Sequence, residues 1–280
     1  MNTQSSIPLA EFLRPKEIKD IVGQEHILGD GQSLRVAIDS GNLPSMILWG
    51  PPGVGKTTIA RVIALNVEAQ FIPLSAVLSG VKEIRESVEK AQFASDHQNK
   101  KTILFVDEVH RFNKSQQDAF LPHIESGLII FIGATTENPS FEVNSALLSR
   151  CQTYVLKTLT LDSLTKIIDK IIDEYKKISI DDLAREMILI YANGDARRLI
   201  NLLEMLINSL KLKVDGVINK ELVNKIISDK VRRFDKGGEQ FYDQISAMHK
   251  SVRGSNPDAS VYWLLRMIDG GADPLYLARR

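Results

Sequence analysis

Short apolar runs alternate with amphipathic stretches through the first half of the chain. Three runs, at 46–49, 103–106 and 128–132, have the length and composition of buried strands, and a fourth short apolar run covers 71–74. Residues 58–64 are typical of a helix, and residues 81–91 carry apolar side chains at helical spacing with charged residues between them. Buried strands that alternate with amphipathic helices predict an α/β fold, with a parallel sheet covered by helices on both faces.

The alternation of apolar strands and amphipathic helices ends near residue 158. From there to about residue 227, leucines and isoleucines recur at helical spacing, which predicts a small all-helical domain. Two further helical segments follow it. We therefore expect three parts, with bounds 1–157, 158–230 and 231–280.

Residues 50–57 form a complete G-x-x-x-x-G-K-T motif between the first strand and the helix that follows. Gly53 and Gly55 let the backbone curl so that successive N–H groups point at one phosphate chain, near the positive end of the helix dipole. Lys56 then reaches the β- and γ-phosphates, and Thr57 holds Mg²⁺. The bland alternative is a surface turn. The motif predicts a nucleotide site made of Gly50, Pro51, Pro52, Gly53, Val54, Gly55, Lys56, Thr57 and Thr58.

Polar residues end the next two strands. Asp107 and Glu108 follow the strand at 103–106. We expect Asp107 to orient Mg²⁺ and Glu108 to polarise the attacking water. Thr136 follows the strand at 128–132 and is a candidate sensor of the γ-phosphate, although a turn threonine would look the same.

Two arginine positions give less specific signals. Arg150 precedes a predicted strand, where a cation at a helix end is the commoner role. Arg197 and Arg198 open a helix, which is an unfavourable place for cations beside the helix dipole and indicates that an anion faces them. The histidines form no metal-binding pattern, so His110 and His123 are interpreted as structural or surface residues.

Composition limits the partners. Lys+Arg and Asp+Glu balance at 35 each, so attraction to DNA needs a local basic patch, for which Lys230, Arg232 and Arg233 are candidates. The single cysteine favours a reducing compartment. The chain lacks a signal peptide at its first residues and an apolar stretch of membrane-spanning length. We expect a cytoplasmic protein with no membrane partner.

The order of the phosphate loop, Asp107-Glu108, Thr136, Ser149-Arg150-Cys151 and residues 194–197 resembles AAA+ ATPases of the clamp-loader clade. Further stretches resemble the replication-associated recombination protein A (RarA/MgsA) family, whose eukaryotic relative is the Werner-helicase-interacting ATPase. They are LAEFLRP at 9–15, DIVGQ at 20–24, VDEVHRFNK at 106–114, GATTENPSF at 133–141 and HKSVRGS at 249–255.

The resemblance implies roles for individual residues. Thr136 corresponds to sensor 1, Arg197 to sensor 2, and Arg150 to an arginine finger that reaches the γ-phosphate of a neighbouring subunit. Arg14 and Val22 lie near the adenine. The three parts become an AAA+ ATPase core, a helical lid and the start of an oligomerisation domain. ATP and Mg²⁺ are the implied cofactors.

The resemblance also implies a DNA-dependent ATPase that remodels DNA or DNA-bound proteins in replication-fork maintenance, recombination and repair. The implied DNA partners are forks, single-strand-containing DNA and DNA ends. The implied protein partners are single-strand-binding protein and, in a homotetramer, other copies of the chain. The implied location is the cytoplasm, at the nucleoid. The family pattern continues past residue 280, so we expect a truncated chain whose self-association is weakened.

Two other functions fit the same motifs. One is a nucleotide-gated scaffold that recruits replication proteins, and the other is a different AAA+ motor, such as a sliding-clamp loader or a branch-migration protein. Stimulation of ATP turnover by DNA separates the scaffold from a motor.

Overall fold

The computed structural model describes residues 8–175, 178–210, 216–232, 239–269, 272 and 274–278. The chain forms two compact units. One consists of Met1–Lys176 with Ile188–Glu204, and the other of Lys177–Met187 with Met205–Arg280. The first unit carries the large sheet and the second is mainly helical.

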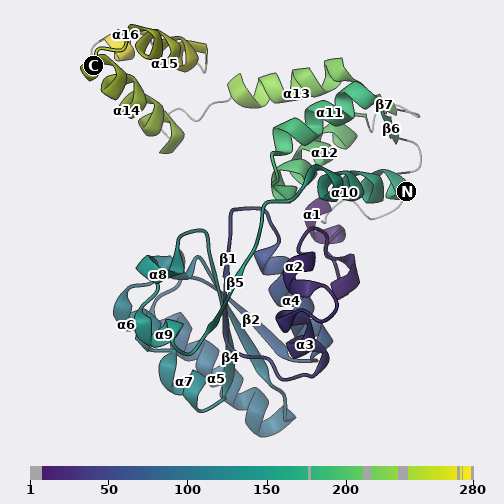
Figure 1. Ribbon diagram of the computed structural model, residues 1–280, viewed down its shortest axis with the longest axis vertical. Coiled ribbons are helices and arrows are strands. Elements are labelled where there is room, and N and C mark those ends of the chain that lie inside the picture. The colour runs from purple at the N-terminus through teal and green to yellow at the C-terminus, as the bar shows by residue number, and fades with distance from the viewer. Residues whose placement is uncertain are drawn as a thin grey trace. The chain divides into compact units, whose positions relative to one another are not determined.

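A five-stranded parallel sheet forms the centre of the first unit (Figure 1). Its spatial order is β2-β3-β4-β1-β5, and every neighbouring pair is parallel. The strands are β1 Met46–Trp49, β2 Gln70–Ser75, β3 Thr102–Asp107, β4 Ile129–Thr135 and β5 Gln152–Val155. Because the strands are parallel, their carboxyl ends lie along one edge of the sheet, where α/β folds of this kind carry their ligand sites.

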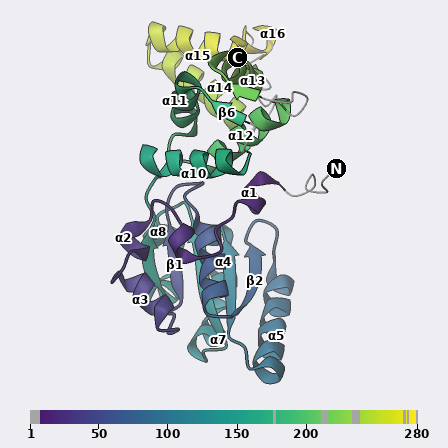
Figure 2. The same cartoon turned by 90° about the vertical axis from the view of Figure 1, so that its right-hand side faces the viewer.

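Helices precede the sheet and connect its strands. They are α1 Leu9–Phe12, η1 Ile18–Asp20, α2 Glu25–Leu28, α3 Ser33–Asp39, α4 Lys56–Asn66, α5 Val81–Gln98, η2 Val109–Arg111, α6 Lys114–Asp118, α7 Leu121–Glu125, α8 Pro139–Glu142 and α9 Ser145–Leu148. Figure 2 looks onto the sheet, with α2 and α3 toward one edge and α5 toward the other, beside β2.

Alternate residues of each strand enter two separate cores. Met46 and Leu48 belong to the apolar cluster that contains residues of α3 and α4, whereas Ile47 belongs to the cluster that contains residues of α5 and α9. Ile103 and Leu104 divide between the two cores in the same way. A strand buried on both faces has no polar alternation, which explains why these strands are continuous apolar runs.

Most of the chain after residue 158 is helical. The helices are α10 Leu161–Glu174, α11 Asp182–Ala192, α12 Ala196–Leu210, α13 Lys220–Arg232, α14 Glu239–Arg253, α15 Pro257–Asp269 and α16 Pro274–Ala278. The structure adds a pair of parallel strands that helical spacing did not reveal, β6 Ile178–Ile180 and β7 Gly216–Ile218. Strands of three residues are too short to show a period-two pattern.

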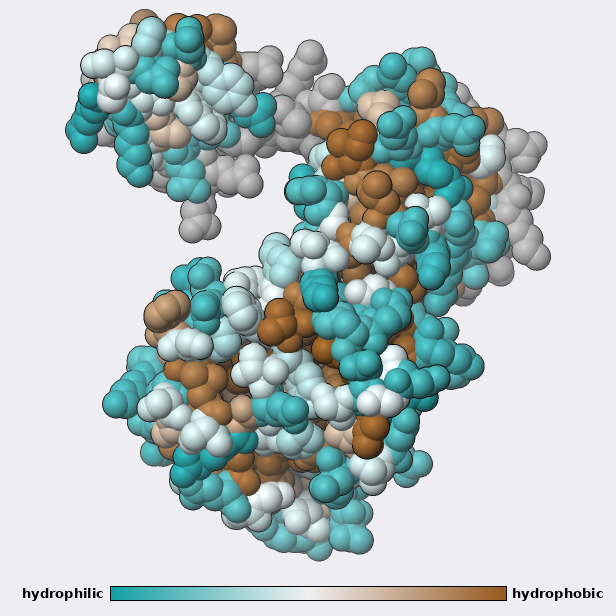
Figure 3. Space-filling view, viewed as in Figure 1, coloured by the Kyte–Doolittle hydropathy of each residue, from teal (hydrophilic) through white to brown (hydrophobic). Residues whose placement is uncertain are grey.

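The predicted fold class is confirmed. A parallel sheet is covered by helices on both faces, and a mainly helical region follows it. The face of the molecule in Figure 3 mixes hydrophilic and hydrophobic residues. Within the described ranges, no helix combines the length and the apolar character that crossing a lipid bilayer requires.

Candidate nucleotide-binding site

The phosphate loop lies between β1 and α4, at the carboxyl edge of the sheet. Gly55 directly precedes α4 with a φ of 101°, a left-handed conformation that favours glycine. Gly50 donates its N–H to the carbonyl of Thr135 at 3.2 Å, and a Cβ at position 50 would lie 2.6 Å from the carbonyl oxygen of Leu156. Glycine is therefore required at both ends of the loop for reasons of backbone geometry and space.

Gly53 joins the phosphate loop to the start of α12. Its carbonyl accepts the backbone N–H of Ala196 at 3.1 Å, and its φ is +71°. A Cβ at this position would lie 1.8 Å from Oδ1 of Asp195. The same Oδ1 accepts the backbone N–H of Arg198 at 2.9 Å and so caps α12. The helix that carries Arg197 is thus fastened against the loop at a point where only glycine fits.

We expect Gly53→Ala to destabilise the protein by about 2–4 kcal/mol, because a positive φ costs a residue with a Cβ about 1 kcal/mol and overpacking adds about 1–3. Gly127→Ala is the matched control, since Gly127 has a φ of +73° and open space around its Cβ position. Urea unfolding of both variants, together with ATP affinity, measures the difference. Equal effects of the two substitutions would show that the contact with Asp195 has no energetic role.

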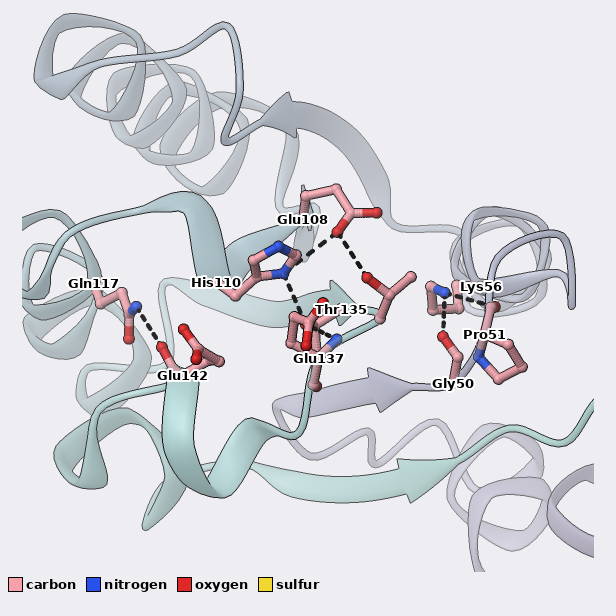
Figure 4. Close-up of polar contacts among 10 residues, drawn as sticks. Gly50, Pro51, Lys56, Glu108, His110, Gln117, Thr135, Glu137 and Glu142 are labelled. Carbon is pink, nitrogen blue, oxygen red and sulfur yellow. Dashed lines mark hydrogen bonds and ion pairs between the residues drawn. The ribbon is translucent and has the colours of Figure 1, made fainter. Parts of the chain in front are cut away.

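Lys56 is folded back onto its own loop. Its ammonium donates to the carbonyl oxygens of Gly50 at 2.6 Å and Pro51 at 2.9 Å (Figure 4). Burial is the main influence on its pKa and lowers it; Glu108 and Asp107 raise the pKa in part, and Arg197 lowers it further. An anion bound in the loop would offset the cost of burying this charge.

Asp107 and Glu108 lie where β3 ends. Glu108 has a left-handed backbone with a φ of 54°, which is uncommon for a residue other than glycine. The hydroxyl of Thr136, which directly follows β4, donates to Oε2 of Glu108 at 3.5 Å. The ends of two neighbouring strands thus bring the candidate water-activating carboxylate together with the candidate γ-phosphate sensor.

His110 belongs to the same group, although the sequence analysis placed it among structural or surface residues. Its Nδ1 lies 3.3 Å from Oε2 of Glu108 and 2.9 Å from Oγ1 of Thr135. The position of His110, two residues after the carboxylate that directly follows β3, was the available signal. Histidine spacing indicates metal ligands and carries no sign of a contact between a histidine and a carboxylate.

A polar cleft gathers most of the predicted site residues. Its lining includes Lys56 and Thr57 from the loop and α4, Asp107 and Glu108 from the end of β3, and Arg197 from α12. Arg198, the second arginine for which an anion was expected, is not among the residues that line the cleft. Its guanidinium lies over the ring of Tyr191, 4.9 Å from the centroid, in a cation–π contact.

An apolar pocket adjoins the polar cleft, and the two linings have six residues in common: Ala10, Arg14, Gly55, Thr58, Ala196 and Ile200. Val22 lines the apolar pocket alone, whereas Ile200 of α12 lines both. No signal in the sequence pointed to Ile200, because an apolar residue in an amphipathic helix looks like any core residue. An apolar slot next to a polar, cation-lined cleft has the chemistry needed for a flat base joined to a phosphate chain.

Arg150 does not line this cleft. It follows α9 and is paired with Glu125 of α7, with its Nε donating to Oε1 of Glu125 at 2.6 Å. Its Nη1 donates to the carbonyl oxygen of Ala146 at 2.8 Å. The side chain of Arg150 is 37% exposed, so it is accessible to another molecule.

The basic residues proposed to contact DNA, Lys230, Arg232 and Arg233, lie at the edge of the described part of the chain or outside it. Lys230 and Arg232 fall in α13, where their side chains lie outside the described part of the chain, and Arg233 lies outside the described residues altogether.

The side chains and backbone of the cleft fit a magnesium-bound nucleoside triphosphate. The loop offers backbone N–H groups at the start of α4, and Lys56 and Arg197 offer positive charge for phosphates. Thr57 and Asp107 place in the cleft oxygen atoms of the kind that Mg²⁺ prefers as ligands.

Comparison with known proteins gives three family matches along the chain. Residues 46–159 match the ATPase family associated with various cellular activities (AAA), residues 174–253 match the AAA C-terminal domain, and residues 254–280 match the MgsA AAA+ ATPase C terminal.

Individual relatives agree with these matches. Replication-associated recombination protein A of Coxiella burnetii is 53% identical over 100% of this chain and 64% of its own length. ATPase WRNIP1 of Dictyostelium discoideum is 43% identical over 99% of this chain and 34% of its own length. The Thermotoga maritima RuvB Holliday junction branch migration motor has a similar structure, with a TM-score of 0.67 and 28% identity over 86% of this chain and 81% of that one.

The sheet, the phosphate loop, the polar cleft and the matched domains together define an AAA ATPase, a class of ATP hydrolases. Within that class the relatives and the C-terminal match are more specific. The chain belongs to the replication-associated recombination protein A family. It spans about 64% of the length of the Coxiella relative.

Proposed function

We propose that this chain binds ATP with Mg²⁺ and hydrolyses it in the polar cleft. The observation that carries the proposal is the cleft itself, in which the cations Lys56 and Arg197 lie with the carboxylates Asp107 and Glu108. Phosphoryl transfer to water requires such a set, because the phosphates, the metal and the water must all be held in place.

Each residue has a role in this proposal. Lys56 and the loop amides hold the phosphates, Arg197 acts from α12 as sensor 2, and Thr57 and Asp107 hold the magnesium ion. The ion neutralises phosphate charge when bound. Glu108 takes the proton of the attacking water, and Thr136 helps to place that water as sensor 1. The base occupies the apolar pocket, beside Arg14 and Val22.

Hydrolysis in this proposal needs a second copy of the chain. Arg150 lies outside its own cleft and is accessible, so it serves as an arginine finger only for a neighbouring subunit. Head-to-tail contacts of this type build rings or crescents. We propose a homotetramer for the family's longer chains, with 231–280 as the start of the oligomerisation domain, 158–230 as the lid and 1–157 as the ATPase core.

The biological task we propose is remodelling of DNA or of DNA-bound proteins in replication-fork maintenance, recombination and repair. The names of the relatives support it: one is a replication-associated recombination protein and another is a Holliday junction branch migration motor. The proposed partners are forked DNA, single-strand-containing DNA, DNA ends and single-strand-binding protein. The proposed location is the cytoplasm, at the nucleoid.

ATP turnover measured with and without forked DNA tests this function. We expect severalfold faster turnover with the fork, because a DNA-remodelling motor couples hydrolysis to its substrate. Lys56→Ala in the same preparation controls for contaminating ATPases. An ATP turnover rate that is the same with and without DNA would favour a nucleotide-gated scaffold. Stimulation only in the presence of a sliding clamp would favour a clamp loader.

A further inference from the structure

A small polar network at the ends of β3 and β4 holds Glu108 from one side (Figure 4). Nδ1 of His110 lies 3.3 Å from Oε2 of Glu108, and the hydroxyl of Thr136 lies 3.5 Å from that same oxygen. Nδ1 also lies 2.9 Å from Oγ1 of Thr135. The side chain of His110 is 9% exposed and Thr135 is fully buried, whereas Glu108 is 33% exposed, so the network is buried behind a carboxylate that water can reach.

The contacts of Nδ1 with Thr135 and Glu108 favour one position for the imidazole proton. Its Oγ1 accepts the backbone N–H of Glu137 at 3.0 Å, and its own proton has the carbonyl oxygen of Glu137 at 3.3 Å as an acceptor. If Nδ1 of His110 carries a proton, it can donate to Glu108 and Thr135, and the hydroxyl of Thr135 keeps the carbonyl oxygen of Glu137 as its own acceptor. A bare Nδ1 would instead direct its lone pair at a carboxylate oxygen, which is repulsive and costly in a buried place.

The two contacts to Glu108 both use Oε2. In the part of the chain that the structure describes, no group hydrogen-bonds Oε1. A carboxylate fixed through one oxygen keeps the other in a defined position for a water molecule. Such fixing matters, because a displacement of about 1 Å in a reacting group can cost about a hundredfold in rate.

We propose that His110 is a positioning residue for ATP hydrolysis. Its Nδ1–H holds Oε2 of Glu108, Thr135 holds the imidazole ring, and Oε1 is left to take the proton of the attacking water. The inference rests on the proposed function of Glu108. It gives a function to His110, which belongs neither to the phosphate loop nor to the proposed magnesium ligands.

Two substitutions at position 110 separate positioning from packing. His110→Asn keeps an N–H donor near the place of Nδ1, whereas His110→Leu keeps apolar bulk and removes the donor. We expect His110→Leu to lower kcat by about tenfold while the Kd for ATP stays unchanged, since the network touches the carboxylate and leaves the loop intact. His110→Asn should retain most of kcat.

Thr135→Val provides a second variant, because it replaces a hydroxyl by a methyl group of similar size. It should lower kcat with unchanged Kd, as the ring of His110 loses its hydrogen-bond partner. In a Glu108→Gln background, His110→Leu should leave the residual turnover unchanged, because His110 acts through Glu108.

Several results would overturn the inference: a normal kcat in His110→Leu, an equal loss in His110→Asn and His110→Leu, or loss of ATP binding together with kcat. If His110→Leu fails to fold, a normal kcat in Thr135→Val overturns it instead. The parent chain is measured first. A parent that binds ATP without turnover contradicts the proposed function, whereas a parent that turns over normally alongside His110→Leu contradicts the positioning role alone.

Discussion

Glu108→Gln should bind ATP as tightly as the parent chain and hydrolyse it at least about a hundredfold more slowly. The amide keeps the size of the carboxylate and its position in the cleft, but it cannot accept the proton of water. Binding should persist because the loop and Lys56 remain intact. Titration with a fluorescent ATP analogue and a phosphate-release assay measure the two properties separately.

Lys56→Ala is the matched comparison for this variant. It removes the ammonium beside the phosphate loop, so its principal defect should be in ATP affinity. Normal turnover in Glu108→Gln would show that Glu108 does not accept the proton of the attacking water. A Gln variant that loses ATP binding would show that position 108 has a structural function.

Arg150→Ala should reduce turnover on the order of a thousandfold, which is the contribution typical of an arginine finger. Binding of ATP within each subunit should be unaffected, because Arg150 lies outside its own cleft. The effect depends on assembly, so it is measured at protein concentrations at which the chain self-associates, as shown by light scattering.

Mixing two inactive variants tests whether the finger acts between subunits. Arg150→Ala retains an intact cleft, and Glu108→Gln retains an intact finger. If the variants mix at random in a head-to-tail assembly, about a quarter of the junctions combine an intact cleft with an intact finger. Turnover should therefore reappear on mixing. A mixture as inactive as its components, although assembled, would contradict action in trans.

Glu125→Gln is the control for Arg150. It removes the ion pair that holds the finger and leaves the guanidinium in place. Surface ion pairs contribute about 0–1 kcal/mol, so this variant should fold and hydrolyse ATP much as the parent does.

The fold could be predicted from the sequence because its determinants are local. The continuous apolar runs around Ile47 and Leu104 identify strands buried on both faces, and the glycines of the phosphate loop identify the turn after β1. Strand order in space could not be predicted, because uniformly apolar strands do not specify which neighbour each one pairs with.

The predictable part of the candidate site is the part that lies in motifs. Lys56, Asp107 and Glu108 occur at positions where strand ends and loop chemistry coincide. Contacts between distant segments could not be predicted: the fit of Gly53 against Asp195 and the bond from His110 to Thr135 depend on tertiary structure.

The left-handed backbone at Glu108 makes folding and chemistry compete at one residue. A φ of 54° costs a side chain with a Cβ about 1 kcal/mol, and glycine would adopt it without strain. Glycine at this position would remove the strain together with the carboxylate and its contacts with Thr136 and His110, so the strain accompanies the residue that hydrolysis needs. Part of the stability that the apolar cores provide offsets the backbone strain at Glu108.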